Sequence, residues 1–306
     1  MKPTITLQRE IGRLYSLGQT PHPYASNNAS ETLMNLYLPY KHGLKDTHYQ
    51  DICKDYAKYD RLTVRQRKIC KPPVHYIDEL CVYFDKDEKW LSDNRDEYYS
   101  RFYWRFRNLI ESNPHKKVAC VFNIAIIGSE SSNGHVEIVV FDPALNVIEH
   151  VDSNHLPKQC MRKERAYMEC CRLSQTIVRN VAAVLPTEPI YISTHDIYSG
   201  YDWGIQSLEA ASDQLTEPEK GGYCLMWAHL LGDLALMFPD DSIKHIIETM
   251  LKKSDSKNTK VLFKNDYLLY VIRGYVADIS KTFGCNFEND DSKHNTCIQF
   301  SKKMNL

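Results

Sequence analysis

The pattern of hydrophobic and polar positions changes near residue 115. Before it, the chain is rich in tyrosine and charge, and its longest helical texture runs over residues 90–110, where aromatic side chains alternate with charges. After it, residues 118–127 form a near-continuous apolar run, which predicts a buried strand. We therefore divide the chain into an N-terminal accessory region over residues 1–115, a main domain over residues 116–284 and a polar C-terminal tail over residues 285–306.

A β-hairpin is predicted next. Residues 135–141 and 147–151 have the pattern of strands, and the segment from Pro143 to Asn146 has the composition of a turn. Apolar residues at helical spacing then predict a long helix over residues 160–185. A short strand over residues 190–194 follows.

A new helical pattern begins at Cys224, directly after a pair of glycines. Apolar side chains recur there on one helical face until Pro239. Two more helices are expected over residues 243–252 and 261–282. The order of strands, helix, strand and helices favours the α+β class.

Composition restricts the class of protein. A hydrophobic content of 43% and a charged content of 25% are typical of a soluble globular protein. The net charge of −1 gives no general attraction to nucleic acid or anionic membranes. No apolar run approaches the roughly 20 residues of a membrane span, and the first residues lack the apolar stretch of a signal peptide. We expect an intracellular monomer without a membrane or nucleic-acid partner.

The ten cysteines are scattered and include no C-x-x-C pair, so reduced and buried thiols are expected. Cys224 differs because it falls in the first turn of a predicted helix. The unpaired backbone N–H groups there favour a thiolate and are able to face the oxyanion of a tetrahedral intermediate. Cys224 is therefore the candidate nucleophile.

Three other residues complete a possible thiol active site. His135 begins a predicted strand and is a suitable general base near neutral pH. Asp152 ends the partner strand, so the hairpin brings it beside His135, where a carboxylate orients the imidazole. Gln206 offers an amide donor for an oxyanion hole. Taken singly, each residue also has an ordinary structural explanation, and only the set predicts a site.

Three other patterns have weaker support. The spacing of His150, Asp152 and His155 is compatible with a metal, but no fourth ligand is evident, so we expect no metal site. A basic cluster over residues 61–68 is more typical of a solvated helix face than of a nucleic-acid site. The aromatic stripe over residues 98–106 is expected to pack onto the main domain.

The order His, Asp, Gln, Cys and the residues around it resemble the ubiquitin-like protease superfamily, which includes adenain and the SUMO-specific proteases. The phrasing is closest to divergent members encoded by large DNA viruses, and the resemblance covers roughly residues 117–238. The motifs that carry it are Gly134-His135, Phe141-Asp142, Val151-Asp152-Ser153, Gly204-Ile205-Gln206 and Gly222-Tyr223-Cys224-Leu225-Met226-Trp227.

The chain departs from the cellular SUMO proteases at two points. Val136 follows the histidine where those enzymes usually have tryptophan, so cleavage after a Gly-Gly tail is not implied. The segment between Gln206 and Cys224 is also longer, and residues 211–220 are expected to form a surface loop near the substrate.

The resemblance implies a papain-like cysteine protease fold of the adenain type, with a central mixed sheet and the nucleophile on a buried helix. It implies a His135, Asp152 and Cys224 triad, Gln206 as oxyanion donor, and no cofactor. Tyr223 and Trp203 are expected to contact substrate. The substrate would be a protein: a conjugate of ubiquitin or a ubiquitin-like modifier, a viral polyprotein or a host factor.

Two alternatives remain open at this point. The first is an acetyltransferase that modifies Ser, Thr or Lys with the same fold and a similar set of residues, which would need acetyl-CoA. The second is a non-catalytic binding protein or virion component.

Overall fold

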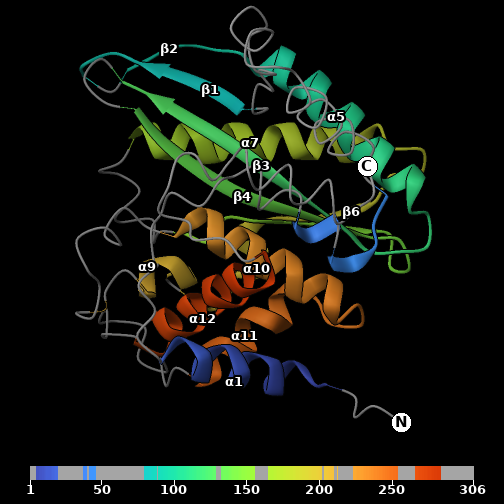
Figure 1. The fold of residues 1–306 in the computed structure, drawn as a ribbon. Coiled ribbons are helices and arrows are strands. Elements are labelled where there is room, and N and C mark those ends of the chain that lie inside the picture. The colour runs from blue at the N-terminus through green and yellow to red at the C-terminus, as the bar shows by residue number, and fades with distance from the viewer. Residues whose placement is uncertain are drawn as a thin grey trace, which may run out of the picture.

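Helices cover both faces of one six-stranded sheet in the computed structural model of the chain (Figure 1). The strands are β1 Glu79–Phe84, β2 Trp90–Asp93, β3 Val118–Ile127, β4 Ser132–Asp142, β5 Val147–Val151 and β6 Ile190–Ile192. The structure describes residues 5–19, 37–39, 41–45, 79–87, 89–128, 132–155, 165–201, 203–209, 212, 223–253 and 266–283.

The sheet is mixed, with the strand order β2-β1-β3-β4-β5-β6. β1 pairs with β3 and β5 pairs with β6 in parallel, whereas the other neighbours are antiparallel. The named helices are α1 Leu7–Gly18, α5 Arg95–Ser112, α7 Arg165–Ala183, α8 Thr194–Ile197, α9 Ile205–Glu209, α10 Cys224–Met237, α11 Ile243–Lys253 and α12 Asp266–Phe283. A mixed sheet with helices between its strands is compatible with the expected α+β class.

Two hydrophobic cores lie on opposite faces of the sheet. Helices α5 and α7 cover one face, and α1, α10, α11 and α12 cover the other (Figure 1). Because side chains alternate along a strand, Val139 of β4 belongs to the first core while Ile138 and Val140 belong to the second. Both faces of β4 are therefore buried.

The predicted hairpin is confirmed, and its turn has a local explanation. The carboxylate of Asp142 accepts hydrogen bonds from the backbone N–H groups of Ala144 and Leu145, at 2.9 and 3.2 Å. Asn146 has a φ of 51°, a left-handed conformation that asparagine adopts more readily than most residues. These contacts set the register in which Ile138 pairs with Val151.

The helix predicted from Cys224 is also confirmed. Its spacing predicted one buried face, but the helix is buried more completely than that. Every residue of α10 from Met226 to Ala235 is buried, so the helix is enclosed on all sides. The carboxylate of Asp233 within it is paired with Lys41 and contacts His42, whose nitrogens each lie 2.6 Å from a carboxylate oxygen.

Several predicted boundaries were wrong. Residues 90–93 form β2, so the helix expected from residue 90 begins at Arg95. The side chain of Asn94 separates the two elements because it bonds the backbone of β1, accepting from Cys81 N–H at 2.8 Å. The predicted strand over residues 190–194 ends at Ile192, since Ser193 caps helix α8.

The described part of residues 1–115 is not a separate unit. β1 pairs with β3, and α1 packs against α12, neither of which we predicted from the sequence. The expected boundary near residue 115 therefore runs through the sheet. As predicted, the aromatic stripe packs inward: Phe102 meets Phe122 of β3 edge to face, with ring centroids 5.1 Å apart. The basic cluster and the C-terminal tail lie outside the described residues. So does the predicted surface loop over residues 211–220, apart from Ser212, which is buried and donates to Asp266.

Within the described segments, every helix is too short or too polar to cross a bilayer.

Helices α1 and α12 touch backbone to backbone at two glycines. A Cβ atom added to Gly274 would lie 1.8 Å from the carbonyl oxygen of Leu14. One added to Gly18 would lie 1.8 Å from the carbonyl oxygen of Tyr270. Both distances are far below any van der Waals contact, so a side chain at either position separates the helices.

We expect Gly274→Ala to lower the free energy of unfolding by about 1–3 kcal/mol, because the added methyl group forces α1 away from α12. Gly12→Ala is the matched control, since a Cβ there meets no atom within 4 Å. Alanine at this helical position should stabilise the protein by roughly 0.5–1 kcal/mol. Urea unfolding followed by circular dichroism measures both values, and stabilisation by both substitutions would contradict the close crossing.

Candidate thiol site

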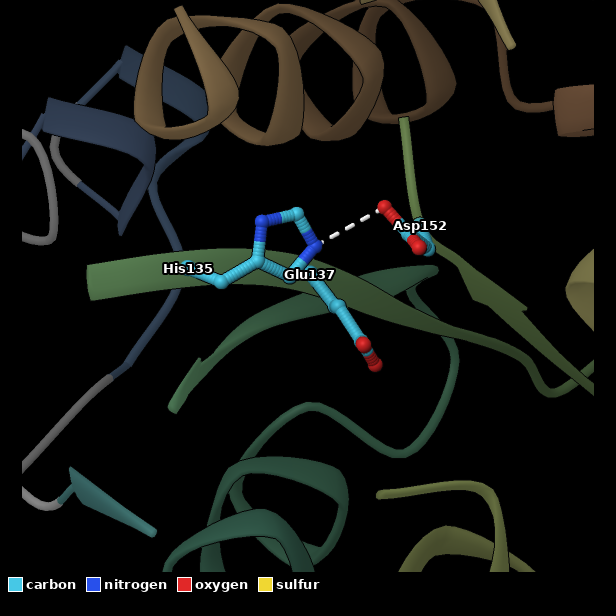
Figure 2. Close-up of side chains that lie close together, drawn as sticks. All are labelled: His135, Glu137 and Asp152. Atoms are coloured by element: carbon cyan, nitrogen blue, oxygen red, sulfur yellow. Dashed lines mark hydrogen bonds and ion pairs between the residues drawn. The ribbon is translucent and has the colours of Figure 1, made fainter. Parts of the chain in front are cut away.

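The structure brings His135 and Asp152 into direct contact. β4 continues past the last pair that it forms with β5, Ile138 with Val151, so His135 lies on a projecting strand end. Its Nε2 atom lies 2.9 Å from Oδ1 of Asp152, which directly follows β5. Both side chains are buried, with exposed fractions of 7% and 5% for the residues (Figure 2).

The electrostatics of His135 link it to Cys224 as well. Burial acts to lower the pKa of His135, but the charge and hydrogen bond of Asp152 act in the opposite direction, and contact with Cys224 adds to them. The net effect raises the pKa of His135 well above its ordinary value. Figure 2 shows Nδ1 pointing away from Asp152, which leaves this nitrogen available to the thiol.

Asp152 is held as a carboxylate. Burial acts to raise its pKa, yet the charge and hydrogen bond of His135 hold that pKa well below the ordinary range, and other donors contribute. The backbone N–H of Asn154 donates to Oδ1 at 2.8 Å, and the hydroxyl of Tyr167 donates to Oδ2. The thiol of Cys171 lies 3.6 Å from the same Oδ2 atom.

Helix α8 fixes the backbone at Asp152. The N–H group of Asp152 donates to Oγ1 of Thr194 at 2.9 Å, and this hydroxyl donates to the carbonyl of His150 at 3.0 Å. Thr194 is the first residue of α8, and Ser193 before it forms a capping box with Asp196. The turn from β6 into α8 therefore locks the end of β5.

Gln206 is attached to the loop that follows Asp152. Its backbone N–H donates to the carbonyl of Ser153 at 3.0 Å, and Oγ of Ser153 donates to its Oε1 at 2.8 Å. The side-chain NH₂ group is left without a partner among the described residues. A Cβ atom on Gly204 would lie 2.3 Å from the Ser153 carbonyl, so this close approach requires glycine.

Cys224 is the first residue of α10, and its side chain is half-buried. The side chain of the preceding residue, Tyr223, makes no capping hydrogen bond to the helix. The Tyr223 side chain therefore does not occupy the first backbone N–H groups of the helix. N–H groups at a helix start stabilise a nearby anion. Ile205 of α9 and Met226 of α10 share one core, which fixes both helix starts to the same body.

Tyr223 does not fit its expected role as a substrate contact. Its side chain is only 1% exposed and belongs to the core, so a substrate cannot reach it in this structure. The periodic pattern did not reveal this because the residue precedes the helix. Trp203 is half-buried and packs against the same core, so a substrate contact there stays a prediction. Trp227 is fully buried.

A second buried pair lies below the first and was missed from the sequence. Nε2 of His150 lies 2.5 Å from Oε2 of Glu137, and both residues are almost completely buried. Ser174 donates to the other oxygen of Glu137 at 3.1 Å, and Nδ1 of His150 lies 3.0 Å from the Tyr191 hydroxyl. The sequence did contain a signal for this pair, because Glu137 and His150 are polar residues on strands that are otherwise apolar.

Two sets of residues bear on metal binding. One ligand atom each of His135, Glu137 and Asp152 lie within 4.8 Å of one another. The Glu137 carboxylate points away from the other two and is occupied by His150 and Ser174 (Figure 2). These residues therefore form a hydrogen-bonded network whose groups already have partners.

His150, Asp152 and His155, the metal pattern considered in the sequence, do not turn toward a common point. His150 turns toward Glu137, whereas the ring of His155 stacks on Tyr198 with centroids 5.2 Å apart. Asp152 is held by His135 and Tyr167. The structural interpretation of this pattern is the one that fits.

Comparison with known proteins found no family model, no curated protein and no solved structure that matches this chain. The resemblance inferred from the motifs therefore stays a prediction.

We expect Asp152→Asn to lower the pKa of His135, because the substitution removes the charge that raises it. A raised pKa means that the pair stabilises the fold fully at pH values below the ordinary histidine pKa of roughly 6.5. This stabilisation is lost as the pH rises through the pKa of folded His135. NMR titration of the imidazole, with urea unfolding at pH 6 and pH 9, measures both effects.

Asp278→Asn is the matched control, since Asp278 pairs with Arg13 at the surface. It should leave the titration of His135 unchanged. Equal titration curves for His135 in the wild-type and Asp152→Asn proteins would contradict the pairing.

Proposed function

We propose that the protein is a cysteine peptidase that acts on a protein substrate. The observation that carries the proposal is the double contact of one buried imidazole, His135, with a carboxylate on one side and with the thiol of Cys224. A thiol needs a neighbouring base and an electropositive setting to act as a nucleophile, and the start of α10 adds the second.

Each group has a role in the reaction. Nδ1 of His135 accepts the thiol proton, and the sulfur of Cys224 attacks the carbonyl carbon of the scissile bond, whose electron pair moves to oxygen. The imidazolium, stabilised by Asp152, then protonates the leaving amine as the carbon–nitrogen bond breaks. A water molecule, deprotonated by His135, hydrolyses the acyl-enzyme and releases the thiol.

The oxyanion is stabilised by two donors in this proposal. One is the backbone N–H group of Cys224, and the other is the NH₂ group of Gln206. Support for the second comes from its anchoring, since Ser153 occupies the amide oxygen and orients the amide. Donors held in place before the reaction stabilise the developing charge without a reorganisation cost.

We also propose a specific fold and a class of substrate. A mixed sheet with a buried helix that begins at Cys224 is consistent with the papain-like architecture of ubiquitin-like proteases. We propose a conjugate of ubiquitin or a ubiquitin-like modifier, or a viral polyprotein, as substrate. No metal or other cofactor takes part in these steps.

We expect Cys224→Ala to abolish turnover and to prevent capture by electrophilic probes, without loss of the fold. The measurement is a panel of probes carrying an electrophile at the C-terminus of ubiquitin, SUMO and related modifiers, with intact-mass detection. Cys81→Ala is the control, because Cys81 is also half-buried but lies on β1. Turnover that survives in Cys224→Ala would refute the proposal, and transfer of label from acetyl-CoA to Cys224 would favour acetyl transfer instead.

Gln206→Ala should reduce kcat by about 10²- to 10³-fold and leave KM within a few fold, because an oxyanion donor acts mainly in the transition state. Gln19→Ala removes an amide at the end of α1 that donates to Tyr15, and it should have little effect. A rise in KM with an unchanged kcat would show that Gln206 binds the substrate rather than the oxyanion.

A further inference from the structure

Tyr167 contacts both members of the buried pair. It is the third residue of α7, and only 8% of it is exposed. Its hydroxyl donates to Oδ2 of Asp152, and its ring lies edge to face with the imidazole of His135, with centroids 5.4 Å apart and an interplanar angle of 77°. We propose that Tyr167 is a positioning residue that holds the carboxylate of Asp152 in the orientation His135 requires; this inference rests on the proposed function.

The two oxygens of Asp152 have different surroundings. Oδ1 faces His135 and the N–H of Asn154, whereas Oδ2 faces α7, where the described donors are Tyr167 and Cys171. A thiol is a weak donor, and at 3.6 Å it is a poor substitute for a hydroxyl. Without the Tyr167 hydroxyl, this buried oxygen loses its strong partner.

The orientation of the carboxylate depends on that partner. The last torsion of an aspartate is broad and roughly two-fold, so hydrogen bonds to Oδ1 alone do not fix the plane of the group. Donors on both oxygens fix this plane. Tyr167 supplies the donor on the second oxygen, and the backbone of Asp152 is already fixed by Thr194.

Helix α7 supports the network along one of its faces. Tyr167, Cys171 and Ser174 are spaced at i, i+4 and i+7, so they share one side of the helix. Tyr167 and Cys171 reach Asp152, and Ser174 reaches Glu137. This polar row adjoins the apolar row through Cys170 and Ile177 that packs the helix onto the sheet.

The hydroxyl of Tyr167 remains a donor at working pH. Burial, followed by the negative charge of Asp152, raises the pKa of Tyr167 well above its ordinary value. The group therefore stays protonated where a thiol peptidase is active. Its aromatic ring also packs edge to face with the imidazole.

Tyr167→Phe tests the inference because it removes the hydroxyl and keeps the ring beside His135. We expect kcat to fall by about 10- to 100-fold with KM changed less than about twofold, which is the range for losing a hydrogen bond to a charged group. The pKa of His135, measured by NMR with the His135→Gln spectrum for assignment, should fall. The alkaline limb of the pH–rate profile should move to lower pH with it.

Tyr191→Phe is the matched control. Its hydroxyl lies 3.0 Å from Nδ1 of His150, so the same atom is removed from the neighbouring pair and not from Asp152. It should leave the pKa of His135 and the pH–rate profile unchanged. A role of Tyr167 in packing alone would change the melting temperature without moving either quantity.

A double-mutant cycle decides whether Tyr167 acts through Asp152. In an Asp152→Asn background, Tyr167→Phe should cause little further loss of kcat, since the group that it positions has already lost its charge. Losses that multiply fully, or an unchanged pKa of His135 in Tyr167→Phe, would overturn the inference. Absence of any Cys224-dependent cleavage, of modifier conjugates and of viral polyprotein alike, would refute the proposed peptidase, whereas the NMR titration tests the hold of Tyr167 on Asp152 independently.

Discussion

The contact between His135 and Asp152 is the interaction on which the candidate site depends. Both groups are buried, and removing charged groups from water is costly unless each remaining hydrogen-bonding position is filled. The structure meets this requirement: Asp152 receives donors at both oxygens, and His135 has Asp152 at one nitrogen and the thiol of Cys224 within interaction range. A pair built in this way holds its geometry because any other arrangement leaves a buried charge unpaired.

The site draws on both layers of helices at the projecting end of β4. α7, from one layer, supports Asp152, and α10, from the other layer, begins at Cys224. His135 stands between them on the end of β4 that projects beyond β5. Because both cores pack against β4, a change in the packing of either core alters the separation between the acid, the base and the thiol.

A second pair, Glu137 with His150, continues the polar network along the same face of the hairpin. The strand period of two places Glu137 next to His135 and His150 next to Asp152 on that face. Buried networks of this kind rigidify a protein when every member is satisfied. Ser174 and Tyr191 complete the partners of this pair, so the hairpin beneath the site is held by polar contacts as well as by apolar packing.

The sequence by itself determined the local elements and the order of the chemical groups. A near-continuous apolar run predicted β3, strand and turn patterns predicted the hairpin of β4 and β5, and helical spacing predicted the start of α10. Turn chemistry at Asp142 and Asn146 explains why the hairpin forms. The tertiary structure alone decided that α1 and β1 join the same body, that Tyr223 is buried, and that Tyr167 reaches Asp152 from a distant helix. The physical reason is that periodicity reports which side of an element is apolar, whereas contacts between elements depend on how those sides pack, and a polar residue on a buried face reveals its partner only when the packing is known.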